Sequence, residues 1–301
     1  MALSLAQAIA RVPSWVGKDA HATPLGGGIT NRNYRVDVAG ESFVLRICGE
    51  ATELVGVNRD AEYAANYAAG QLGIAPPVFY RILPESYLVT RFIHGEPIPP
   101  DAMGKPENIR RVAQAIKQFH ALPLTLPTTF SPFRRVEQMA KIARERGARF
   151  PKNFDWFVAQ MRKVERAFLR DPFVPRPCHD DLLNANFLDD GRLYILDWEF
   201  AGMGDVFFDL ANFASHHRFD DAQVRVLLQA YFGDFTAQQF ARLQLMRAMS
   251  EIHEAMLGVA QSCISKLDFD FNAYADLWFG RAAQFIQNPE WEKWLKETTN
   301  A

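Results

Sequence analysis

The stretch from Cys178 to Phe200, CHDDLLNANFLDDGRLYILDWEF, constrains the fold more than any other part of the chain. It gathers acidic and amide side chains in a loop and then places Asp197 after a short apolar strand. Asp181 is followed five residues later by Asn186 and sixteen residues later by Asp197. A carboxylate that orients a hydroxyl, with an Asn and an Asp as hard oxygen ligands for Mg²⁺, meets the needs of phosphoryl transfer from a nucleotide. The stretch therefore predicts kinase chemistry.

The size and charge of the chain limit the other possibilities. At 301 residues, with 49% apolar composition, it can supply a core for one large domain or for two lobes that share a cleft. The 33 basic and 35 acidic residues give a net charge of −2, which offers no reason to expect a nucleic-acid or anionic-membrane partner. Any phosphate site must then be a local arrangement.

The cysteines indicate a reducing compartment. Cys48, Cys178 and Cys263 are odd in number, far apart and without a Cys-x-x-Cys pair, so they predict neither a disulfide framework nor a thiolate zinc site. The N-terminal MALSLAQAIARVPSW is typical of a short amphipathic helix, and no stretch approaches ~18 uninterrupted apolar residues. We therefore expect a cytoplasmic protein without a membrane span.

Two alternations of apolar and polar residues near the N-terminus predict a pair of antiparallel strands. The apolar positions are Tyr34, Val36 and Val38 in the first strand and Phe43, Leu45 and Ile47 in the second. The interval Ala39-Gly40-Glu41 between them suits a hairpin turn. Three glycines, Gly26, Gly27 and Gly28, lie just before the first strand, where backbone N–H groups can approach phosphate oxygens. By themselves these glycines indicate only a tight turn.

A cation inside the second strand needs a partner. Arg46 lies on the face opposite the apolar residues of that strand. The segment from about Asn58 to Leu72 has alanines at helical intervals, is followed by Gly73 and the Pro76-Pro77 pair, and carries Glu62. A strand cation paired with a helix carboxylate, reaching together toward nucleotide phosphates, is a recurring kinase arrangement. The alternative is a surface ion pair worth ~0 to 1 kcal/mol.

The pattern of the chain changes after SYLVTRFIHGEPI, Ser86 to Ile98, which is typical of a buried strand followed by a Gly-Glu-Pro turn. We expect a hinge at about 92–97 between an N-terminal nucleotide-binding lobe, 1–91, and a larger catalytic and substrate-binding lobe, 92–301. Helical stripes follow at Ile109, Val112, Ile116 and Phe119, and at Phe240, Leu243, Met246, Met249, His253, Met256, Ala260 and Cys263. The expected fold class is α+β, with a small antiparallel-sheet lobe and a mostly helical lobe.

The ordered set of motifs resembles the choline/ethanolamine kinase family within the aminoglycoside phosphotransferase superfamily, a branch of the protein-kinase-like fold. The order is a glycine turn, a strand cation, a helix Glu, a hinge, His-x-Asp-x-x-x-x-Asn and a strand Asp. The most specific segments are HDDLLNANFL and YILDWEFAGMGDVFFDLANF, and the likeness runs from about Thr23 to at least Trp278. The segments GGGITNRNYRV and FVLRICG look more like the choline kinase branch, in which an arginine recurs at the position of Arg46.

The resemblance implies a role for each matching residue. Asp181 would be the catalytic base or hydroxyl-orienting carboxylate. Asn186, a second catalytic position, and Asp197 would hold Mg²⁺ bridging the phosphates of ATP. Nucleotide binding would fall to Gly26, Gly27, Gly28, Asn31, Arg46 and Glu62.

Three further residues would shape the catalytic loop rather than react. His179 would brace the loop through a structural hydrogen bond, and Asp180 would lie behind the reacting groups. Asp209, in FDLAN, would tether the loop by accepting backbone N–H bonds.

The acceptor must be inferred from the aromatic and acidic residues. A quaternary ammonium has no N–H to donate, so proteins hold it by aromatic faces and nearby carboxylates. Trp198 follows the metal aspartate directly, and the segment Leu267–Phe285 is rich in aromatic residues. Carboxylates at Glu199, Glu251 and Glu254 add negative charge, although most aromatics in a chain with 24 Phe serve packing. The expected substrate contacts are Asp181, Trp198, Glu199, Glu251 and Trp278.

Two departures from the family pattern bear on the acceptor. Choline kinases often show Glu-Trp after FDLAN, where this chain has His216-His217, and Met256 stands where a Trp is often found. The aromatic cage is therefore incomplete or rebuilt, and the family's aromatic contacts do not transfer directly.

We expect ATP- and Mg²⁺-dependent phosphorylation of a small amino alcohol, with choline or ethanolamine preferred. Thiamine, a sugar or an aminoglycoside are alternative acceptors, although the mixed-charge tail NPEWEKWLKETTN does not resemble a polycation site. A nucleotide-binding regulatory pseudokinase is the alternative outside enzymes, but such a protein would not need the base. The expected partner is the small alcohol, and a homodimer stays open.

Overall fold

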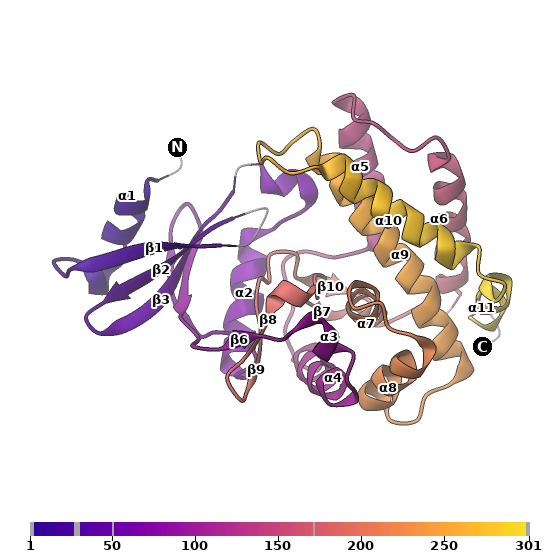
Figure 1. The fold of residues 1–301 in the computed structure, drawn as a ribbon, viewed down its shortest axis with the longest axis horizontal. Coiled ribbons are helices and arrows are strands. Elements are labelled where there is room, and N and C mark those ends of the chain that lie inside the picture. Colours follow the sequence, from indigo (N-terminus) through magenta and orange to yellow (C-terminus); the bar gives the residue numbers. More distant parts are fainter. Residues whose placement is uncertain (1–2, 27–30, 50, 171, 299–301) are drawn as a thin grey trace.

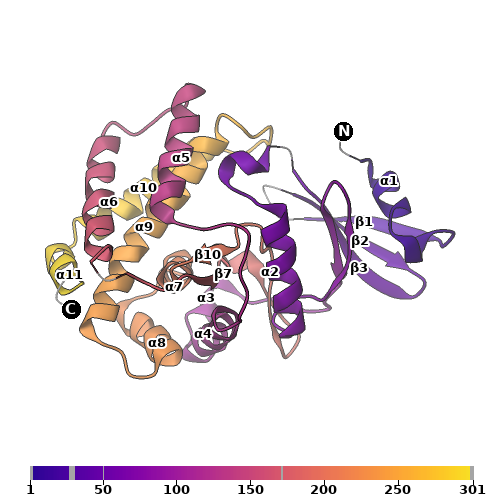
Figure 2. The same cartoon turned by 180° about the vertical axis from the view of Figure 1, so that it is seen from behind.

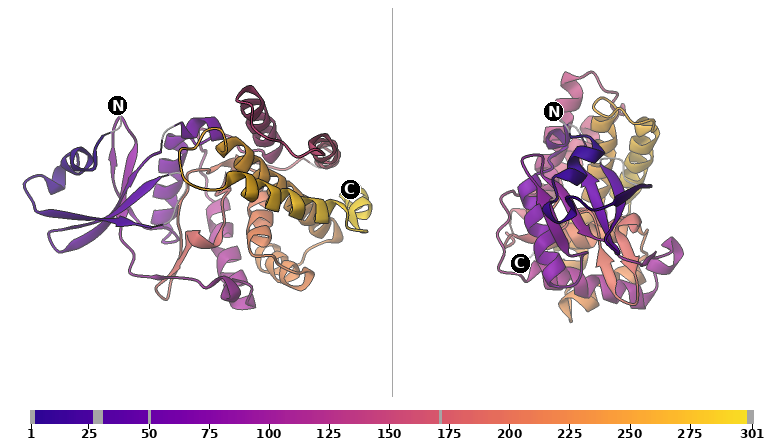
Figure 3. Two further views of the ribbon diagram at one scale, coloured as in Figure 1. Left: turned by 45° about the horizontal axis from the view of Figure 1, so that its top comes forward. Right: turned by 90° about the vertical axis from the view of Figure 1, so that its left-hand side faces the viewer.

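The computed structural model of the chain describes residues 3–26, 31–49, 51–170 and 172–298. A small region built around an antiparallel sheet adjoins a larger region made mostly of helices (Figure 1). The sheet and the C-terminal helices lie at opposite ends of the long axis (Figure 3). The predicted α+β class is confirmed. Among the described residues, no helix combines the length and apolar character needed to cross a bilayer.

The N-terminal sheet has five strands in the order β1-β2-β3-β5-β4. They are β1 (Ala20–Leu25), β2 (Arg32–Val38), β3 (Glu41–Ile47), β4 (Val78–Ile82) and β5 (Tyr87–Arg91). The predicted hairpin is confirmed, because β2 pairs with β3 and Val38 lies opposite Glu41. Its turn residues, Ala39 and Gly40, have φ of 53° and 80°, the positive values that a two-residue hairpin turn requires.

One face of this sheet is covered by the N-terminal segment. The predicted short helix is α1 (Leu5–Ala10), and a 3-10 turn, η1 (Pro13–Trp15), follows it. The ring of Trp15 lies 5.3 Å from that of Phe43, and both residues are buried. This apolar cluster holds the sheet together without residues from the large helical region.

Helix α2 (Arg59–Gln71) connects the sheet to the large region. It begins where predicted, because the side chain of Asn58 accepts the N–H groups of Asp60 and Ala61 at its first turn. Ala61, Ala65 and Ala69 are buried in the hydrophobic cluster of the large region, although this helix falls within residues 1–91. Seen from behind, α2 stands between the sheet and the other helices (Figure 2). The lobe boundary near residue 92 stays a prediction.

Helices build the large region around one long central helix. They are α3 (Pro100–Met103), α4 (Pro106–His120), α5 (Pro132–Glu145), α6 (Phe154–Phe168), α7 (Val206–His216), α8 (Asp221–Phe232), α9 (Ala237–Gln261), α10 (Phe271–Ile286) and α11 (Trp291–Glu297). The two predicted helical stripes correspond to α4 and α9, and α9 is packed by α5, α7 and α10. Cys263 lies just beyond the end of α9.

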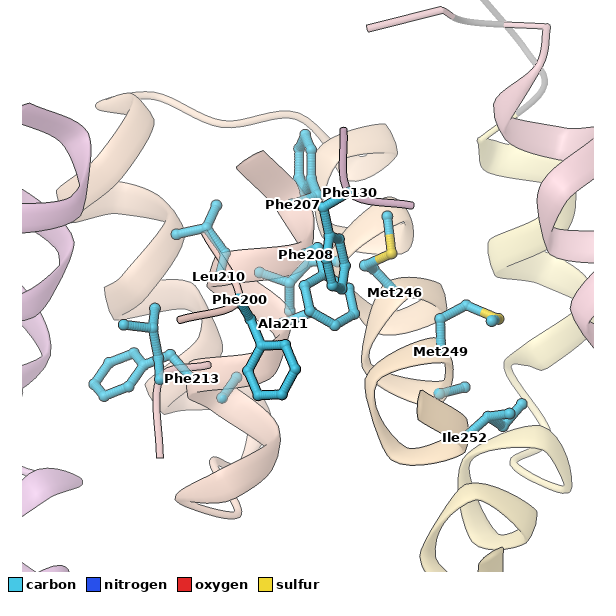
Figure 4. Close-up of a cluster of buried hydrophobic side chains, with 14 of the residues drawn as sticks. Phe130, Phe200, Phe207, Phe208, Leu210, Ala211, Phe213, Met246, Met249 and Ile252 are labelled. Atoms are coloured by element: carbon cyan, nitrogen blue, oxygen red, sulfur yellow. The ribbon is translucent and has the colours of Figure 1, made fainter. Parts of the chain in front are cut away.

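The packing of α7 on α9 fixes the base of the candidate site. Figure 4 shows aromatic and aliphatic side chains of α7 beside Met246, Met249 and Ile252 of α9. Phe208 has no exposed surface, and its ring lies 4.6 Å from that of Phe130. Burial of an aromatic side chain of this kind stabilises the fold by about 1.5–3 kcal/mol. Helix α7, which carries Asp209, is therefore rigidly placed.

Short strand pairs present the catalytic segment. Strand β7 (Arg176–Cys178) pairs with β10 (Gly202–Gly204), and β8 (Phe187–Asp189) lies between β6 (Glu96–Pro97) and β9 (Leu193–Ile195). The predicted Gly-Glu-Pro turn is wrong, because Glu96 is extended and pairs with Asp189. Gly95 permits this, since a Cβ there would lie 3.0 Å from the Asp189 carbonyl oxygen.

Candidate active site

The loop between β7 and β8 is anchored on helix α7. Asp209 accepts the N–H groups of His179 (2.9 Å) and Asp180 (2.7 Å), and Asn212 Oδ1 accepts that of Leu182 (2.6 Å). Burial alone would raise the pKa of Asp209, but its hydrogen bonds with His120 and with the backbone N–H of His179 help to lower the pKa below the ordinary value. The tether expected from Asp209 is present as predicted.

His179 connects the loop to the strand that precedes Asp197. Its ring is fully buried, Nδ1 accepts the N–H of Asp181 (3.1 Å), and Nε2 donates to the carbonyl oxygen of Leu196 (2.8 Å). The predicted bracing role is therefore confirmed. Both ring nitrogens are engaged in these bonds, so His179 holds the loop rather than exchanging protons.

Asp180 lies behind the loop, as predicted. Its backbone adopts φ of 67°, and its carboxylate is buried without a hydrogen bond to any described residue. Burial, followed by the charge of Asp209, raises its pKa well above the ordinary value.

Asp181 and Asn186 meet as their spacing predicts. Asn186 Nδ2 donates to the backbone carbonyl of Asp181 (2.9 Å) and lies 3.4 Å from its carboxylate oxygen Oδ2. Because the amide nitrogen is used in this way, the amide oxygen is left for another partner. Burial, with the charges of Glu254, Asp197 and Glu199, raises the pKa of Asp181 well above the ordinary value. Such a concentration of oxygen donors and negative charge fits a hard divalent cation.

The predicted pair between a strand cation and a helix carboxylate is present, and it is buried. Arg46 on β3 pairs with Glu62 on α2, and its Nη1 lies 2.7 Å from Asp197 Oδ1. The Arg46 and Glu62 side chains are 9% and 1% exposed, which excludes a solvated surface pair. Asp197, two residues after the end of β9, adopts φ of 57°. The sheet and the catalytic segment therefore meet at Arg46.

A second arginine extends this network and was not predicted. Arg59, in the first turn of α2, lies 2.8 Å from Glu62 and 3.3 Å from Glu199. Its other nitrogen donates to Asn31 Oδ1 (3.3 Å) and Thr52 Oγ1 (2.9 Å). The spacing of Arg59 and Glu62, three residues apart on a helix, was the signal available in the sequence.

Two predicted residues of the glycine segment can be placed. Asn31 Nδ2 donates to Glu199 Oε2 (2.9 Å), so Asn31 joins the charge network beside Asp197. Gly26 follows β1 with open space where a Cβ would lie. Gly27 and Gly28 fall outside the described residues.

Asp181 also lies close to side chains from α7, α9 and α10. One ligand atom each of Asp181, His216 and Glu254 lie within 4.8 Å of one another. Tyr274 donates its O–H to Glu254 (2.7 Å), and His216 Nε2 lies 3.5 Å from the same carboxylate. Burial alone would raise the pKa of Glu254, but its interactions with His216 and His253 lower it. A buried carboxylate ion thus faces the predicted base.

The predicted acceptor contacts are corrected in part. Trp198 has no exposed surface, because its ring packs 4.4 Å from that of Phe119 and its Nε1 donates to Ile195 (3.0 Å). Glu199 belongs to the network of Arg59 instead. Glu251 is buried and pairs with Arg281 (2.8 Å). These positions do not support substrate contacts by Trp198, Glu199 or Glu251.

Trp278 does lie beside the cluster. It is 5% exposed, its ring meets that of His216 edge-on at 4.9 Å, and the Arg281 guanidinium lies 4.1 Å from its centroid. Glu254, three residues from Glu251 on α9, is the carboxylate that reaches Asp181.

The other residues at which the chain departs from the family pattern, His217 and Met256, have structural roles. His217 donates from Nδ1 to the carbonyl of Phe213 (2.8 Å), and burial lowers its pKa to about 4, so the ring is neutral near pH 7. Met256 has no exposed surface. Of the three positions, only His216 reaches the cluster around Asp181.

A small antiparallel sheet, a helical region and an Asp–Asn–Asp set between them define a kinase-like phosphotransferase. Residues 21–245 match the model of the phosphotransferase enzyme family, and the chain belongs to that family. It is therefore an enzyme that transfers a phosphoryl group to an alcohol acceptor.

Named relatives agree with this assignment. The chain is 28% identical to a choline/ethanolamine kinase family protein from Mesorhizobium loti, whose crystal structure superposes with a TM-score of 0.84 over 97% of each chain. Protein LicA of Haemophilus influenzae is 24% identical over 242 residues, 77% of this chain and 70% of LicA. Ethanolamine kinase 2 of Mus musculus is 25% identical over 305 residues, 89% of this chain and 77% of the relative.

More distant structures share the fold. The GDP complex of aminoglycoside 2'-phosphotransferase-IIIa superposes with a TM-score of 0.66 at 14% identity, over 92% of this chain and 96% of that one. The predicted kinase-like fold and the resemblance to the choline/ethanolamine kinases are thus confirmed.

Proposed function

We propose that this enzyme transfers the γ-phosphoryl group of ATP to the hydroxyl of a small amino alcohol, with choline or ethanolamine preferred. The observation that supports this most is the 4.8 Å cluster of Asp181, His216 and Glu254. An amino alcohol carries its cationic nitrogen two carbons from its hydroxyl. Glu254 suits that nitrogen while Asp181 reaches the hydroxyl. The printed names of the choline and ethanolamine kinases among the relatives point to the same acceptors.

Asp181 is assigned to orient the acceptor hydroxyl and to receive its proton as the oxygen attacks phosphorus. Its raised pKa suits a group that must bind a proton during the reaction. Asn186 keeps Asp181 in place through the 2.9 Å bond to its carbonyl. His179 and Asp209 hold the loop backbone, so the carboxylate is positioned before the substrate arrives.

Asn186 and Asp197 would hold Mg²⁺, through the amide oxygen and the carboxylate. When bound, Mg²⁺ would supply positive charge that offsets the negative charge developing on the transferred phosphoryl group. We assign Arg46 and Glu62, with Gly26 to Gly28 and Asn31, to the nucleotide side of the site. Residues 92–97 are assigned as the hinge between lobes.

The surroundings of Glu254 bear on the choice between the two acceptors. Ethanolamine keeps ammonium N–H donors, which Glu254 and its neighbours accept. Choline depends on aromatic faces, and here Tyr274 and Trp278 are the rings of α10 beside the cluster. Because Arg281 already covers Trp278, we expect ethanolamine to be bound at least as well as choline. A cytoplasmic location fits the free cysteines.

The test is ATP consumption, with Mg²⁺, across choline, ethanolamine, thiamine, simple sugars and an aminoglycoside. We expect ATP turnover with choline and ethanolamine to exceed the turnover without any acceptor. Turnover with sugars or aminoglycosides alone would overturn the acceptor class. Binding of Mg-ATP without turnover on any acceptor would favour the regulatory pseudokinase.

A further inference from the structure

A cavity of about 710 Å³ lies in the large region, and its lining includes none of Asp181, Asn186, Asp197, His216 or Glu254. Its walls are the ends of α4, α7, α8 and α9 and the segment 172–176. In Figure 1 the labels of α4, α7 and α8 mark this part of the molecule. A cavity of this volume is in the range that holds a small organic molecule. The proposed phosphoryl transfer at Asp181 does not involve this cavity.

Aromatic residues form much of the cavity wall. Phe207 and Phe232 stack with ring centroids 5.3 Å apart, and Tyr231 meets Phe232 edge-on at 4.7 Å. Phe173 and Val174 from the segment before β7 are 44% and 70% exposed. Covering exposed apolar side chains with an apolar group of a ligand removes their surface from water, which favours binding. The wall therefore suits a ligand with an aromatic or aliphatic body.

The charge of the lining is positive. Lys117 and Arg176 are both exposed, and neither forms an ion pair with any residue in the described parts of the chain. Lys117 Nζ lies 6.0 Å from the ring centroid of Tyr231. The carboxylate in the lining, Asp205, is already paired with Arg242 (2.7 Å). An anionic group on the ligand would therefore find two cations to bind.

The cavity is connected to the catalytic loop by hydrogen bonds. Tyr231 donates its O–H to His120 Nδ1 (2.6 Å), and His120 donates from Nε2 to Asp209 (2.8 Å). This direction follows because a carboxylate only accepts, which places the ring proton on Nε2. Asp209 in turn accepts the backbone N–H groups of His179 and Asp180. Tyr231 in the cavity wall is therefore separated by two hydrogen bonds from Asp209, which anchors the loop that carries Asp181.

We propose that this cavity is a regulatory site for a small organic anion with an aromatic or aliphatic body. Lys117 and Arg176 bind the anionic group, and the rings of α7 and α8 cover the body. Occupancy is transmitted through Tyr231, His120 and Asp209 to the catalytic loop.

Binding is tested with phenylphosphonate by isothermal titration calorimetry. The protein is first saturated with Mg²⁺ and a non-hydrolysable ATP analogue, so that the nucleotide site is filled. The variant is Lys117→Gln/Arg176→Gln, and its control is Lys141→Gln/Lys152→Gln, which removes two exposed charges elsewhere.

We expect one bound phenylphosphonate per chain. The Kd should rise about tenfold or more in the Lys117→Gln/Arg176→Gln variant, because charge-assisted contacts are lost. The control should bind like the wild type. Absence of binding to the wild type, or equal Kd in the variant and its control, would overturn the site. This assay needs no turnover, so it stands apart from the identity of the acceptor.

Transmission is tested with Tyr231→Phe, which keeps the ring and removes the O–H. At saturating Mg-ATP and amino alcohol, phenylphosphonate should change kcat of the wild type by about fivefold or more, the lower end of ordinary coupling between sites. Tyr231→Phe should bind the probe with unchanged Kd and lose that effect. A wild-type kcat indifferent to bound probe, or the same change in Tyr231→Phe, would overturn the transmission route.

Discussion

Arg46 on β3 donates to Asp197 across 2.7 Å, so one ion pair joins the small sheet to the catalytic segment. The same guanidinium pairs with Glu62 on α2. Three elements from distant parts of the chain therefore meet at a single buried side chain. The planar guanidinium of Arg46 contacts the carboxylates of Glu62 and Asp197 at once. The relative positions of these residues in the proposed nucleotide site therefore depend on Arg46.

Replacing Arg46 tests that junction. Arg46→Met keeps an unbranched apolar stem, removes the guanidinium charge, and leaves Glu62 with Arg59 as a partner. We expect KM for Mg-ATP to rise about ten- to a hundredfold, which corresponds to the loss of one charged hydrogen bond. The KM of Arg46→Lys for Mg-ATP should lie between the values of the wild type and Arg46→Met. Arg91→Met, which breaks an exposed pair with Glu41 on the same sheet, is the control. Equal KM values for the two Met variants would count against the assignment.

Asp209 should support kcat without touching the substrate. In Asp209→Asn the new NH₂ group faces a backbone N–H of His179 or Asp180, so one donor loses its acceptor. We expect the free energy of unfolding to fall by about 1–3 kcal/mol. In the folded variant kcat should fall while KM for Mg-ATP is retained. Asp234→Asn, at an exposed position, should change neither. A folded Asp209→Asn variant with full kcat would contradict the tether.

Glu254 and Glu251 allow a matched comparison on one helix. Both are buried, but only Glu254 lies in the cluster with Asp181. We expect Glu254→Gln to raise KM for ethanolamine about tenfold or more, because an ammonium loses its ionic partner. Glu251→Gln should leave that KM near the wild-type value. The reverse result in acceptor kinetics would restore the sequence-based assignment of Glu251.

Glu251 also predicts a pH dependence of stability. Burial raises its pKa to about 7, against the opposing charges of Arg281 and Arg247. The folded state then holds a proton that the unfolded state releases, so the free energy of unfolding falls as pH rises from the unfolded pKa toward about 7. Because each pH unit between the unfolded and folded pKa is worth ~1.4 kcal/mol, the loss is up to about 3 kcal/mol. Denaturant unfolding of Glu251→Gln should lack this decline, and parallel pH profiles of the two proteins would refute it.

The sequence alone predicted those elements whose structure depends on the local pattern of residues. Alternation around Ala39-Gly40 predicted the β2–β3 hairpin, and Asn58 marked the start of α2. The offsets from Asp181 to Asn186 and Asp197 predicted a set that the short strands bring together. These features depend on neighbours in the chain, which a sequence displays directly.

Contacts between distant elements were harder to predict. Trp198 and Glu199 follow Asp197 in the chain, yet one packs on Phe119 and the other joins Arg59. Glu251 and Glu254 differ by less than one helical turn, and only the packing of α7, α9 and α10 decides which one faces Asp181. Such choices depend on tertiary packing, which periodicity alone does not contain.

The central claim is that Asp181 acts on the acceptor hydroxyl, and the kcat of Asp181→Asn measures this most directly. With Mg-ATP and the best amino alcohol saturating, kcat should fall by about 10²–10⁴-fold, the usual contribution of a positioned base. Affinity for Mg-ATP should be retained. Asp190→Asn, at the exposed turn of the same segment, should keep its kcat. An Asp181→Asn variant with wild-type kcat would contradict the account.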